Sequence, residues 1–259
     1  MTAAEPQFIS SRYNALLKEL RRLAQDNGAY RKQNRVWVEG DHLCRAALAR
    51  GFKPALGVFS EDFWPQARTE FGAAASKSVV VANSLYSGLS GLESPALLAF
   101  VIDLPSVPSI DPGAASVILD RVQDAGNVGA ILRSAGAFGF RQVIAIQGTA
   151  ALWSPKVLRA GMGAHFGLRL IEGVVPSVLD ALAVPIVATS SHHGESLHRA
   201  VLPWPCAWAF GHEGQGVGDE VGSRASLAVR IAQPGGEESL NVASAAAICL
   251  HHSASRNAA

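Results

Sequence analysis

Apolar residues recur along the chain with two different spacings, which predict helices alternating with strands. Over residues 10–24, leucines recur at helical spacing while basic residues occupy the rest of the wheel, which predicts an amphipathic helix. Residues 36–38 form a short apolar run that predicts a strand, and residues 41–50 read as a helix closed by Gly51. Three more strands are predicted at 56–59, 78–81 and 97–102. Together these elements predict a small α/β domain.

A proline-rich stretch separates this first part of the chain from a second alternating pattern. Residues 103–115, DLPSVPSIDPGAA, hold three prolines and no periodic pattern, so we expect domains over 1–105 and 116–259 with a linker at 106–115. Strands are predicted at 116–120, 142–146, 168–171, 185–189, 206–210 and 227–231. Helices are predicted at 128–138, 155–160, 176–182 and 239–252. Such alternation is typical of a mostly parallel sheet covered on both faces.

Composition places the chain among soluble globular proteins. It has 259 residues, of which 49% are hydrophobic and 17% charged, and no apolar run reaches the roughly 18 residues that span a bilayer. The first residues lack the basic start and apolar core of a signal peptide. Cys44, Cys206 and Cys249 lie far apart and are odd in number, which suggests neither a disulfide framework nor a zinc site. We therefore expect a reduced, cytoplasmic protein.

Basic residues are concentrated near the start of the chain, although the formal net charge is only +1. Residues 12–53 hold ten lysines and arginines but only four acidic residues. Two interpretations stay open: an ordinary solvated helix face, or a surface that follows a phosphate backbone.

Three glycine-rich segments in the second half of the chain carry the candidate chemistry. They read DRVQDAGNVGAILRSAGAFGF from Asp120, AFGHEGQGVGDE from Ala209, and IAQPGGEESLNVASAAAICL from Ile231. Each follows an apolar strand, and the first and third then enter a helix. Three such turns can bring bare backbone together around one ligand.

The first segment combines a predicted helix start with an unusual arginine. Asn127 is a candidate N-cap for a helix starting near Val128, and Gly129 allows close approach of backbone or substrate. Arg133 and Ser134 follow among small apolar residues. Arg133 has two open interpretations: it pairs with a carboxylate at a domain surface, or its planar fork holds a phosphate or ribose in a cleft.

The second segment resembles a nucleotide-binding loop only superficially. Gly211, Gly214, Gly216 and Gly218 surround Glu213, so the backbone can adopt positive φ angles and approach a ligand closely. A phosphate-binding P-loop needs a Lys-Ser/Thr pair after its last glycine, which this segment lacks. The dinucleotide-binding GxGxxG pattern is also missing.

The third segment places polar side chains at the start of an Ala-rich helix. Ser239 is a candidate N-cap, and the amide of Asn241 lies at the same helix end, where free N–H groups collect. The helix could be an ordinary capped core helix, but that interpretation does not explain why Ser-Leu-Asn follows a loop so rich in glycine.

Histidines and tryptophans add little to the candidate chemistry. His192, His193 and His198 have no carboxylate or cysteine at helpful spacing, so no metal site is predicted. The tryptophans at 153, 204 and 208 could stack on bases, but core or interface packing is the preferred interpretation.

The three segments resemble the three motifs of the SpoU, or TrmH-like, RNA ribose 2′-O-methyltransferases of the SPOUT superfamily. The sequences NVGAILRSAGAFGF, FGHEGQGV and ESLNVASAAAICL agree with the family's motifs in residues, in order and in their strand-loop-helix context. The similarity covers roughly residues 116–254. ISSRYNALLKELRRL and VWVEGDHLCRAAL are similar to the family's N-terminal substrate-binding domain, which itself resembles a small ribosomal-protein-type RNA-binding fold.

The resemblance implies a fold, a cofactor and a partner. The fold is a SPOUT α/β domain with a deep trefoil knot, and the chain would form a homodimer; general topology rules alone would never have suggested a knot. The cofactor would be S-adenosylmethionine. By position, the cofactor contacts implied are Thr189, Gly211, Gly216, Ile231 and Leu240. The family's catalytic and structural positions fall on Asn127, Arg133, Glu213, Ser239 and Asn241.

One departure affects the cofactor loop. Where the family usually has Pro-Met after the isoleucine of the third motif, this chain has Ala232-Gln233-Pro234. The loop is therefore expected to differ in shape, although Ser-Leu-Asn is intact.

The implied reaction is attack of a ribose 2′-hydroxyl on the cofactor's methyl group, with RNA as substrate. Ribosomal RNA of the large subunit, 23S rRNA, is the first expectation and transfer RNA the second. A non-catalytic RNA-binding or ribosome-assembly factor with the same fold is the alternative, but such a protein would be expected to lose Arg133 or Asn241, and both are present. Methylation of a base instead of a ribose is a further alternative.

Overall fold

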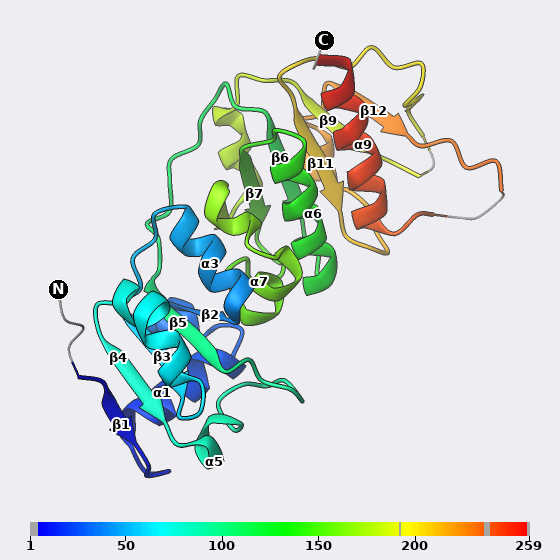
Figure 1. Cartoon of the computed structure of the whole chain (residues 1–259). Coiled ribbons are helices and arrows are strands. Elements are labelled where there is room, and N and C mark those ends of the chain that lie inside the picture. Colours follow the sequence, from blue (N-terminus) through cyan, green and yellow to red (C-terminus); the bar gives the residue numbers. More distant parts are fainter. Residues whose placement is uncertain (1–4, 192, 236–238, 258–259) are drawn as a thin grey trace. The chain divides into compact units, whose positions relative to one another are not determined.

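The chain forms two compact units, each built around its own sheet. The computed structural model describes residues 5–191, 193–235 and 239–257 (Figure 1). The first unit comprises the chain up to Ser106 together with Trp153–Phe166, and the second comprises Val107–Leu152 and the chain from Gly167. The division at Ser106 falls within the Pro-rich stretch, where residues 104–115 contain neither helix nor strand. Trp153–Phe166, however, belongs to the first unit, whereas the sequence pattern predicts a second domain that is continuous over residues 116–259.

The first unit contains a five-stranded mixed sheet in the order β1-β4-β3-β5-β2. Its strands are β1 (Gln7–Ile9), β2 (Arg35–Glu39), β3 (Leu56–Ser60), β4 (Ser78–Val81) and β5 (Leu98–Asp103). Its helices are α1 (Ala15–Gln25), α2 (Ala29–Gln33), α3 (Asp41–Ala49), α4 (Trp64–Ala67), the π-turn η1 (Arg68–Gly72), α5 (Asn83–Tyr86), α7 (Pro155–Gly161) and the 3-10 turn η2 (Ala164–Gly167), whose last residue belongs to the second unit. The helices α1, α2, α3 and α7 pack against β2.

The second unit contains a seven-stranded, fully parallel sheet in the order β10-β12-β9-β11-β6-β7-β8. Its strands are β6 (Ser116–Asp120), β7 (Gln142–Ile146), β8 (Arg169–Val174), β9 (Ile186–Thr189), β10 (Glu195–Ser196), β11 (Ala207–Gly211) and β12 (Leu227–Arg230). Its helices are α6 (Ala125–Ala137), the 3-10 helix η3 (Pro176–Ala181), α8 (Asp219–Gly222) and α9 (Val242–Asn257). The α/β class with mostly parallel strands, predicted from the sequence, is confirmed for this unit.

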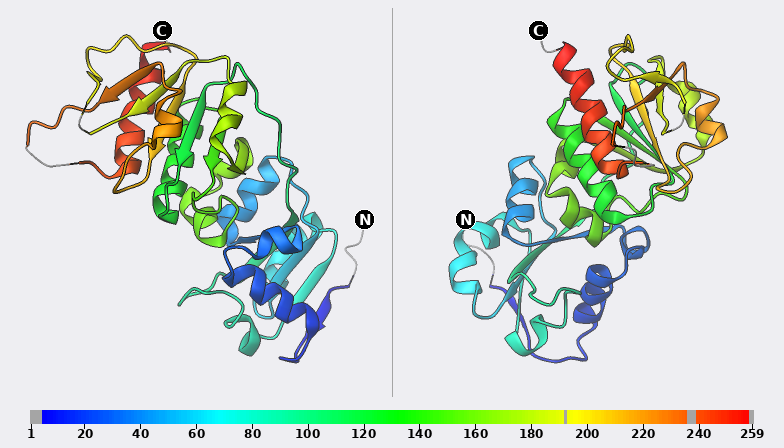
Figure 2. Two further views of the ribbon diagram at one scale, coloured as in Figure 1. Left: turned by 180° about the vertical axis from the view of Figure 1, so that it is seen from behind. Right: turned by 90° about the vertical axis from the view of Figure 1, so that its right-hand side faces the viewer.

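Alternating side chains of the parallel strands build a core on each face of this sheet. Ile118 of β6 and Ala207 and Ala209 of β11 lie in one buried cluster, with η3 and α8 contributing Leu179 and Val221. The intervening positions of β11 face the opposite way, and Trp208 there donates from Nε1 to Oγ of Ser253 in α9 at 2.8 Å. On that face α9 lies beside α6 (Figure 2).

Three helices of the structure differ from the helices predicted from the sequence. The segment predicted as a helix over 176–182 is the 3-10 helix η3, and the first helix after β6 begins at Ala125, three residues before Val128. The last helix begins at Val242, so the predicted start at Ser239 is wrong. The sequence analysis also missed the short elements β1, β10, α2 and α8, because each is too short to show a period.

Among the described helices, none is long and apolar enough to cross a bilayer.

We expect the hydrogen bond between Trp208 and Ser253 to contribute to the free energy of unfolding. Ser253→Ala leaves a fully buried indole N–H without this acceptor, so the free energy of unfolding in urea should fall by about 1–3 kcal/mol. The control is Ser255→Ala, an exposed serine two residues further along α9, which should change it by less than about 0.5 kcal/mol. Equal stabilities for the two variants would show that the bond contributes nothing.

Candidate active site

The three glycine-rich segments leave the parallel sheet at one edge. Asp120 ends β6 and Gly211 ends β11, and the two residues are register partners on adjacent strands. Thr189 ends β9, which lies on the other side of β11, and β12 follows next to β9. Because the carboxyl ends of parallel strands point the same way, the loops after β6, β11 and β12 all start from this edge, where ligands of open α/β sheets bind.

Asp124, and not Asn127, caps helix α6. The Asp124 carboxylate accepts a hydrogen bond from the backbone N–H of Asn127 at 2.8 Å, and the helix begins at Ala125. The predicted N-cap role of Asn127 is therefore wrong, because an acidic residue three positions earlier takes it. This leaves the Asn127 side chain, in the first turn, available for contacts with other segments.

Glu213 of the second segment binds the start of α6. Its carboxylate accepts from the backbone N–H groups of Gln123 at 3.2 Å and Asp124 at 3.1 Å, and from Nδ2 of Asn127 at 3.1 Å. Burial acts to raise the pKa of Glu213, but these hydrogen bonds to the charged form outweigh it and hold the pKa below its ordinary value. Glu213 is thus an ionised acceptor that neutralises free N–H groups at a helix start, and a weak base.

Asn241 of the third segment completes this connection. Its Nδ2 donates to Oδ1 of Asn127 at 2.9 Å, while its own Oδ1 accepts from the backbone N–H groups of Ala243 at 2.9 Å and Ser244 at 3.2 Å. Asn241 therefore caps α9, and the prediction that Ser239 does so is wrong. We call Glu213, Asn127 and Asn241 the carboxylate–amide chain.

The carboxylate–amide chain has only one consistent hydrogen-bond direction. Ionised Glu213 can only accept, so Asn127 presents its NH2 group to Glu213 and its oxygen to Asn241. Asn241 must then turn its oxygen toward the first amides of α9. Each of the three glycine-rich segments contributes one of these three side chains, so the three motifs form one site.

The loop after β11 folds tightly over Gly211. A Cβ atom at this position would lie 1.9 Å from the carbonyl carbon of Gly216 and 2.1 Å from the nitrogen of Val217. The N–H of Gly216 donates to the carbonyl oxygen of His212 at 2.8 Å, and Gly216 itself has a φ of +69°. Only glycine fits at 211, and position 216 strongly favours it.

The other predicted site residues lie outside the carboxylate–amide chain. Arg133 is exposed on α6 and makes no hydrogen bond or ion pair with any residue that the structure describes. Ser239 and Leu240 are exposed, and Ile231 is half-buried. The Thr189 hydroxyl donates to the carbonyl oxygen of Ala209 at 3.0 Å.

Comparisons with known proteins fit this arrangement. Residues 114–251 match the SpoU rRNA Methylase family. The chain belongs to this family. It is 30% identical to the 23S rRNA (guanosine(2553)-2′-O)-methyltransferase RlmP of Bacillus subtilis, over 85% of this chain and 89% of the relative.

Solved structures of related proteins agree over nearly the whole chain. A putative RNA methyltransferase of the TrmH family from Porphyromonas gingivalis has a TM-score of 0.81 and 29% identity, covering 95% of this chain and 100% of that one. An AdoMet-bound rRNA methyltransferase from Sinorhizobium meliloti has a TM-score of 0.84 and 26% identity, covering 97% and 98%. The expected family is confirmed. The 2′-O-methyltransferase activity named for RlmP and the AdoMet bound in the Sinorhizobium meliloti structure agree with the expected activity and cofactor.

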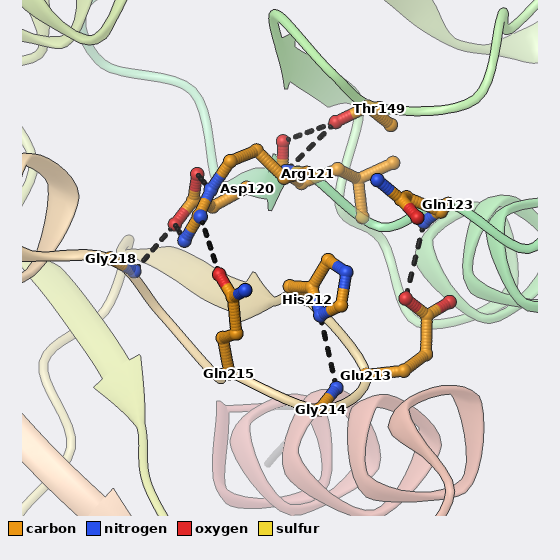
Figure 3. Close-up of polar contacts among 10 residues, drawn as sticks. Asp120, Arg121, Gln123, Thr149, His212, Glu213, Gly214, Gln215 and Gly218 are labelled. Atoms are coloured by element: carbon orange, nitrogen blue, oxygen red, sulfur yellow. Dashed lines mark hydrogen bonds and ion pairs between the residues drawn. The ribbon is translucent and has the colours of Figure 1, made fainter.

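The sequence analysis did not single out Asp120, Arg121 and Gln215, whose hydrogen bonds connect the end of β6 to the loop that carries Glu213. Figure 3 shows the Arg121 guanidinium between the Asp120 carboxylate and the Gln215 side chain, above the loop that carries Glu213. The one available signal was a carboxylate directly after the apolar run Val117–Leu119. Nothing in the sequence indicates that an arginine follows it in a left-handed conformation.

The described residues include no candidate metal site, and the cysteines are poorly placed to react. Within residues 5–191, 193–235 and 239–257, no three His, Cys, Asp or Glu side chains are arranged to hold a metal ion. His192 lies outside the described residues. The three cysteines are free and buried, and burial raises the pKa of Cys206 to about 11 and that of Cys249 to about 12.

The lowered pKa of Glu213 predicts a pH-dependent contribution to stability. Glu213→Gln offers one acceptor oxygen to three N–H donors, so at about pH 7 the free energy of unfolding should fall by on the order of 1 kcal/mol, a low figure because solvent screens the exposed carboxylate. A depressed folded-state pKa stabilises above the unfolded value of about 4.3 and ceases to do so as pH falls through the folded value. The difference between wild type and variant should therefore shrink as the pH falls below the unfolded value and through the lower folded value.

Urea unfolding at a series of pH values measures this difference. Glu195→Gln, an exposed glutamate of the same unit, is a control for general charge effects. A gap between wild type and Glu213→Gln that stays constant down to the acid limit would contradict an ionised Glu213 at the start of α6.

Proposed function

We propose that this chain methylates a ribose 2′-hydroxyl of 23S rRNA, taking the methyl group from S-adenosylmethionine. The observation that carries the proposal is the carboxylate–amide chain, which gathers polar side chains from three distant motifs at the ligand-binding edge of a parallel sheet. The similarity to the 23S rRNA methyltransferase RlmP supports ribosomal RNA over transfer RNA. A non-catalytic role is disfavoured because Asn127, Glu213 and Asn241 are all present and connected.

The loops after β9, β11 and β12 fit the cofactor. Oε1 of Gln233, in the loop after β12, is buried and has no hydrogen-bond partner among the described residues, so an acceptor is available there. In this loop, Ala232-Gln233-Pro234 departs from the usual sequence of the family. Bare backbone at positions 211 and 216 allows close approach. We propose that the cofactor is held by Thr189, Gly211, Gly216, Ile231 and Leu240.

Positioning supplies most of the catalysis in this proposal. When bound, the cofactor would supply an electrophilic methyl group on a sulfonium: the C–S bond breaks as the O–CH3 bond forms, the thioether S-adenosylhomocysteine is the leaving group, and the hydroxyl proton passes to water. This chain therefore has to align the hydroxyl and stabilise charge. Correct alignment alone lowers a barrier by about 7–11 kcal/mol. The NH2 groups of Asn127 and Asn241 each use one N–H within the carboxylate–amide chain, and each keeps a second N–H that can orient the ribose. The exposed Ser239 hydroxyl is a third orienting group.

Arg133 is proposed as the electrostatic partner of the reacting oxygen. A guanidinium stays protonated in proteins and is therefore a poor base, but its planar fork can stabilise the developing alkoxide and hold the neighbouring phosphate. The exposed Arg133 side chain has no competing carboxylate among the described residues. Glu213 acts as a positioning residue, because three N–H donors occupy its carboxylate and lower its pKa.

The RNA is proposed to bind through part of the basic stretch in the first unit. Arg45 is engaged by Asp41 and Glu70, so it is not available to phosphates. Arg21 donates to the carbonyl oxygen of Gly88 at 2.9 Å. Exposed basic side chains without a carboxylate partner in the described structure remain, namely Arg12, Lys18, Lys32, Arg50 and Lys53. These five are the proposed phosphate contacts.

We also propose the knot and the homodimer that the family resemblance implies, and a cytoplasmic location. In support of the knot, β9 and β11 lie between β12 and β6 in the sheet, yet the chain after β12 returns to pack α9 beside α6 (Figure 2). The free, buried cysteines suit a reducing compartment.

Arg133→Ala tests the proposed chemistry. Transfer of radiolabelled methyl to large-subunit ribosomal RNA should fall by roughly a hundredfold or more, because no other described side chain replaces its charge at the reacting oxygen. Cofactor affinity by calorimetry should stay within about twofold of wild type, since Arg133 is not a proposed cofactor contact. Arg141→Ala, another exposed arginine of this unit, is the matched control. Transfer that survives within about tenfold of wild type would remove this role from Arg133.

A double variant tests the proposed RNA surface. Lys18→Gln with Lys32→Gln should weaken RNA binding and reduce the slope of log affinity against log salt by about 0.7–0.9 for each phosphate that is no longer neutralised. Arg45→Gln, whose guanidinium is already paired, should leave the slope unchanged. Point variants are preferable to truncation, because Phe166 packs against Phe52 at 5.1 Å and removal of residues 1–105 would strip this partner. Equal slopes for all three proteins would contradict the surface.

A further inference from the structure

Arg121 adopts a backbone conformation that arginine rarely occupies. It directly follows β6 and has a φ of +61°, in the left-handed region where glycine and asparagine are the usual residues. The neighbouring structure must supply the free energy that this conformation costs, and such positions cluster at functional sites. Here the backbone N–H of Arg121 donates to Oγ1 of Thr149 at 3.1 Å, and the Thr149 hydroxyl donates back to the carbonyl oxygen of Leu119 at 2.9 Å.

The Arg121 side chain joins a buried carboxylate to the loop after β11. Its Nε donates to Oδ1 of Asp120 at 3.0 Å and its Nη2 donates to Oδ2 at 3.3 Å. Its Nη1 donates to Oε1 of Gln215 at 3.0 Å (Figure 3). The Asp120 carboxylate is only 4% exposed and also accepts from the N–H of Gly218 at 2.6 Å. A buried carboxylate requires such a charged partner.

Two glycines leave room for the Arg121 side chain. A Cβ atom at Gly218 would lie 2.6 Å from Nη2 of Arg121, and one at Gly148 would lie 3.2 Å from its Cγ. The Arg121 side chain therefore packs closely between the backbone at Gly148 and the backbone at Gly218. We call Asp120, Arg121 and their contacts with Gln215 and Gly218 the Arg121 latch.

The latch is the second of two anchors on one loop. Glu213 ties the first part of the loop to the start of α6, and the Arg121 latch ties Gln215 and Gly218 to the end of β6. Gly216, with its positive φ, lies between the two anchors and directly over Gly211. The orientation of the backbone groups at 216 and 217 therefore depends on both anchors.

We infer that Arg121 is a positioning residue for cofactor binding: the Arg121 latch holds the loop of residues 212–218 in its binding conformation before the cofactor arrives. The inference rests on the proposed function, because Gly211 and Gly216 are proposed cofactor contacts. A loop ordered in advance gives up less conformational entropy on binding, so loss of the latch should appear as weaker cofactor affinity. Catalysis at saturating cofactor should be spared, because the latch touches no reacting atom.

Arg121→Gly is the main test, because glycine suits the left-handed backbone while it removes the side chain. Cofactor affinity by calorimetry should fall on the order of tenfold, and KM for the cofactor should rise in proportion. The turnover number at saturating cofactor should stay within about threefold, and KM for RNA should not change. Arg121→Lys keeps the charge but loses the fork, so it should restore only part of the affinity.

Two further variants keep the result interpretable. Gln215→Ala removes only the exposed loop end of the latch and should weaken cofactor binding in the same direction, even if Arg121→Gly fails to fold. Arg224→Ala removes an arginine of the same unit that pairs with Asp180 at 2.7 Å and also donates to the carbonyl oxygen of Glu220. Neither partner belongs to the loop of residues 212–218, so this variant should leave cofactor affinity unchanged. Hydrogen exchange in the absence of cofactor should show faster exchange of the Gly216 and Gly218 amides in Arg121→Gly than in wild type.

The outcomes separate this inference from the proposed function. Wild-type cofactor affinity in both Arg121→Gly and Gln215→Ala would overturn the positioning role while leaving the methyltransferase proposal intact. A loss confined to KM for RNA would mean that Arg121 contacts a phosphate instead, which also overturns it. Failure of the wild-type protein to bind S-adenosylmethionine would overturn the proposed function and, with it, the role given to the latch.

Discussion

The hydrogen bond from Asn241 to Asn127 is the contact on which the site depends, because it closes the connection among three segments that are far apart in sequence. Each segment alone is an ordinary turn at the end of a strand. Once Glu213 is ionised, the donor and acceptor directions of both asparagine amides follow. The hydrogen bonds of the network therefore have only one possible arrangement of donors and acceptors.

The same logic explains why the site lies where it does. The α6 and α9 helices both start at the carboxyl edge of the sheet, so their unpaired N–H groups would otherwise face solvent or ligand. Asp124, Glu213 and Asn241 satisfy part of this demand, and the remaining donors at the edge stay available.

Sequence reasoning recovered the order of strands and helices well but placed helix starts poorly. The apolar runs at 116–120 and 142–146 coincide with β6 and β7, because a fully buried parallel strand has an unmistakable composition. Both caps were misassigned, since Asp124 and Asn241 compete with Asn127 and Ser239, and spacing alone does not decide which side chain caps. The left-handed Arg121 could not be predicted, because its conformation depends on Asp120, Thr149 and Gln215 acting together.

The segment Trp153–Phe166 has a consequence for the engineering of this protein. It interrupts the sequence of the catalytic unit, yet it belongs to the first unit, where α7 packs against β2. Exchange of the N-terminal unit between relatives with different RNA targets would therefore need two junctions in addition to the one near Ser106. A chimera joined at the Pro-rich stretch alone would combine an α7 from one parent with a β2 from the other, and so would disrupt the packing of these two elements.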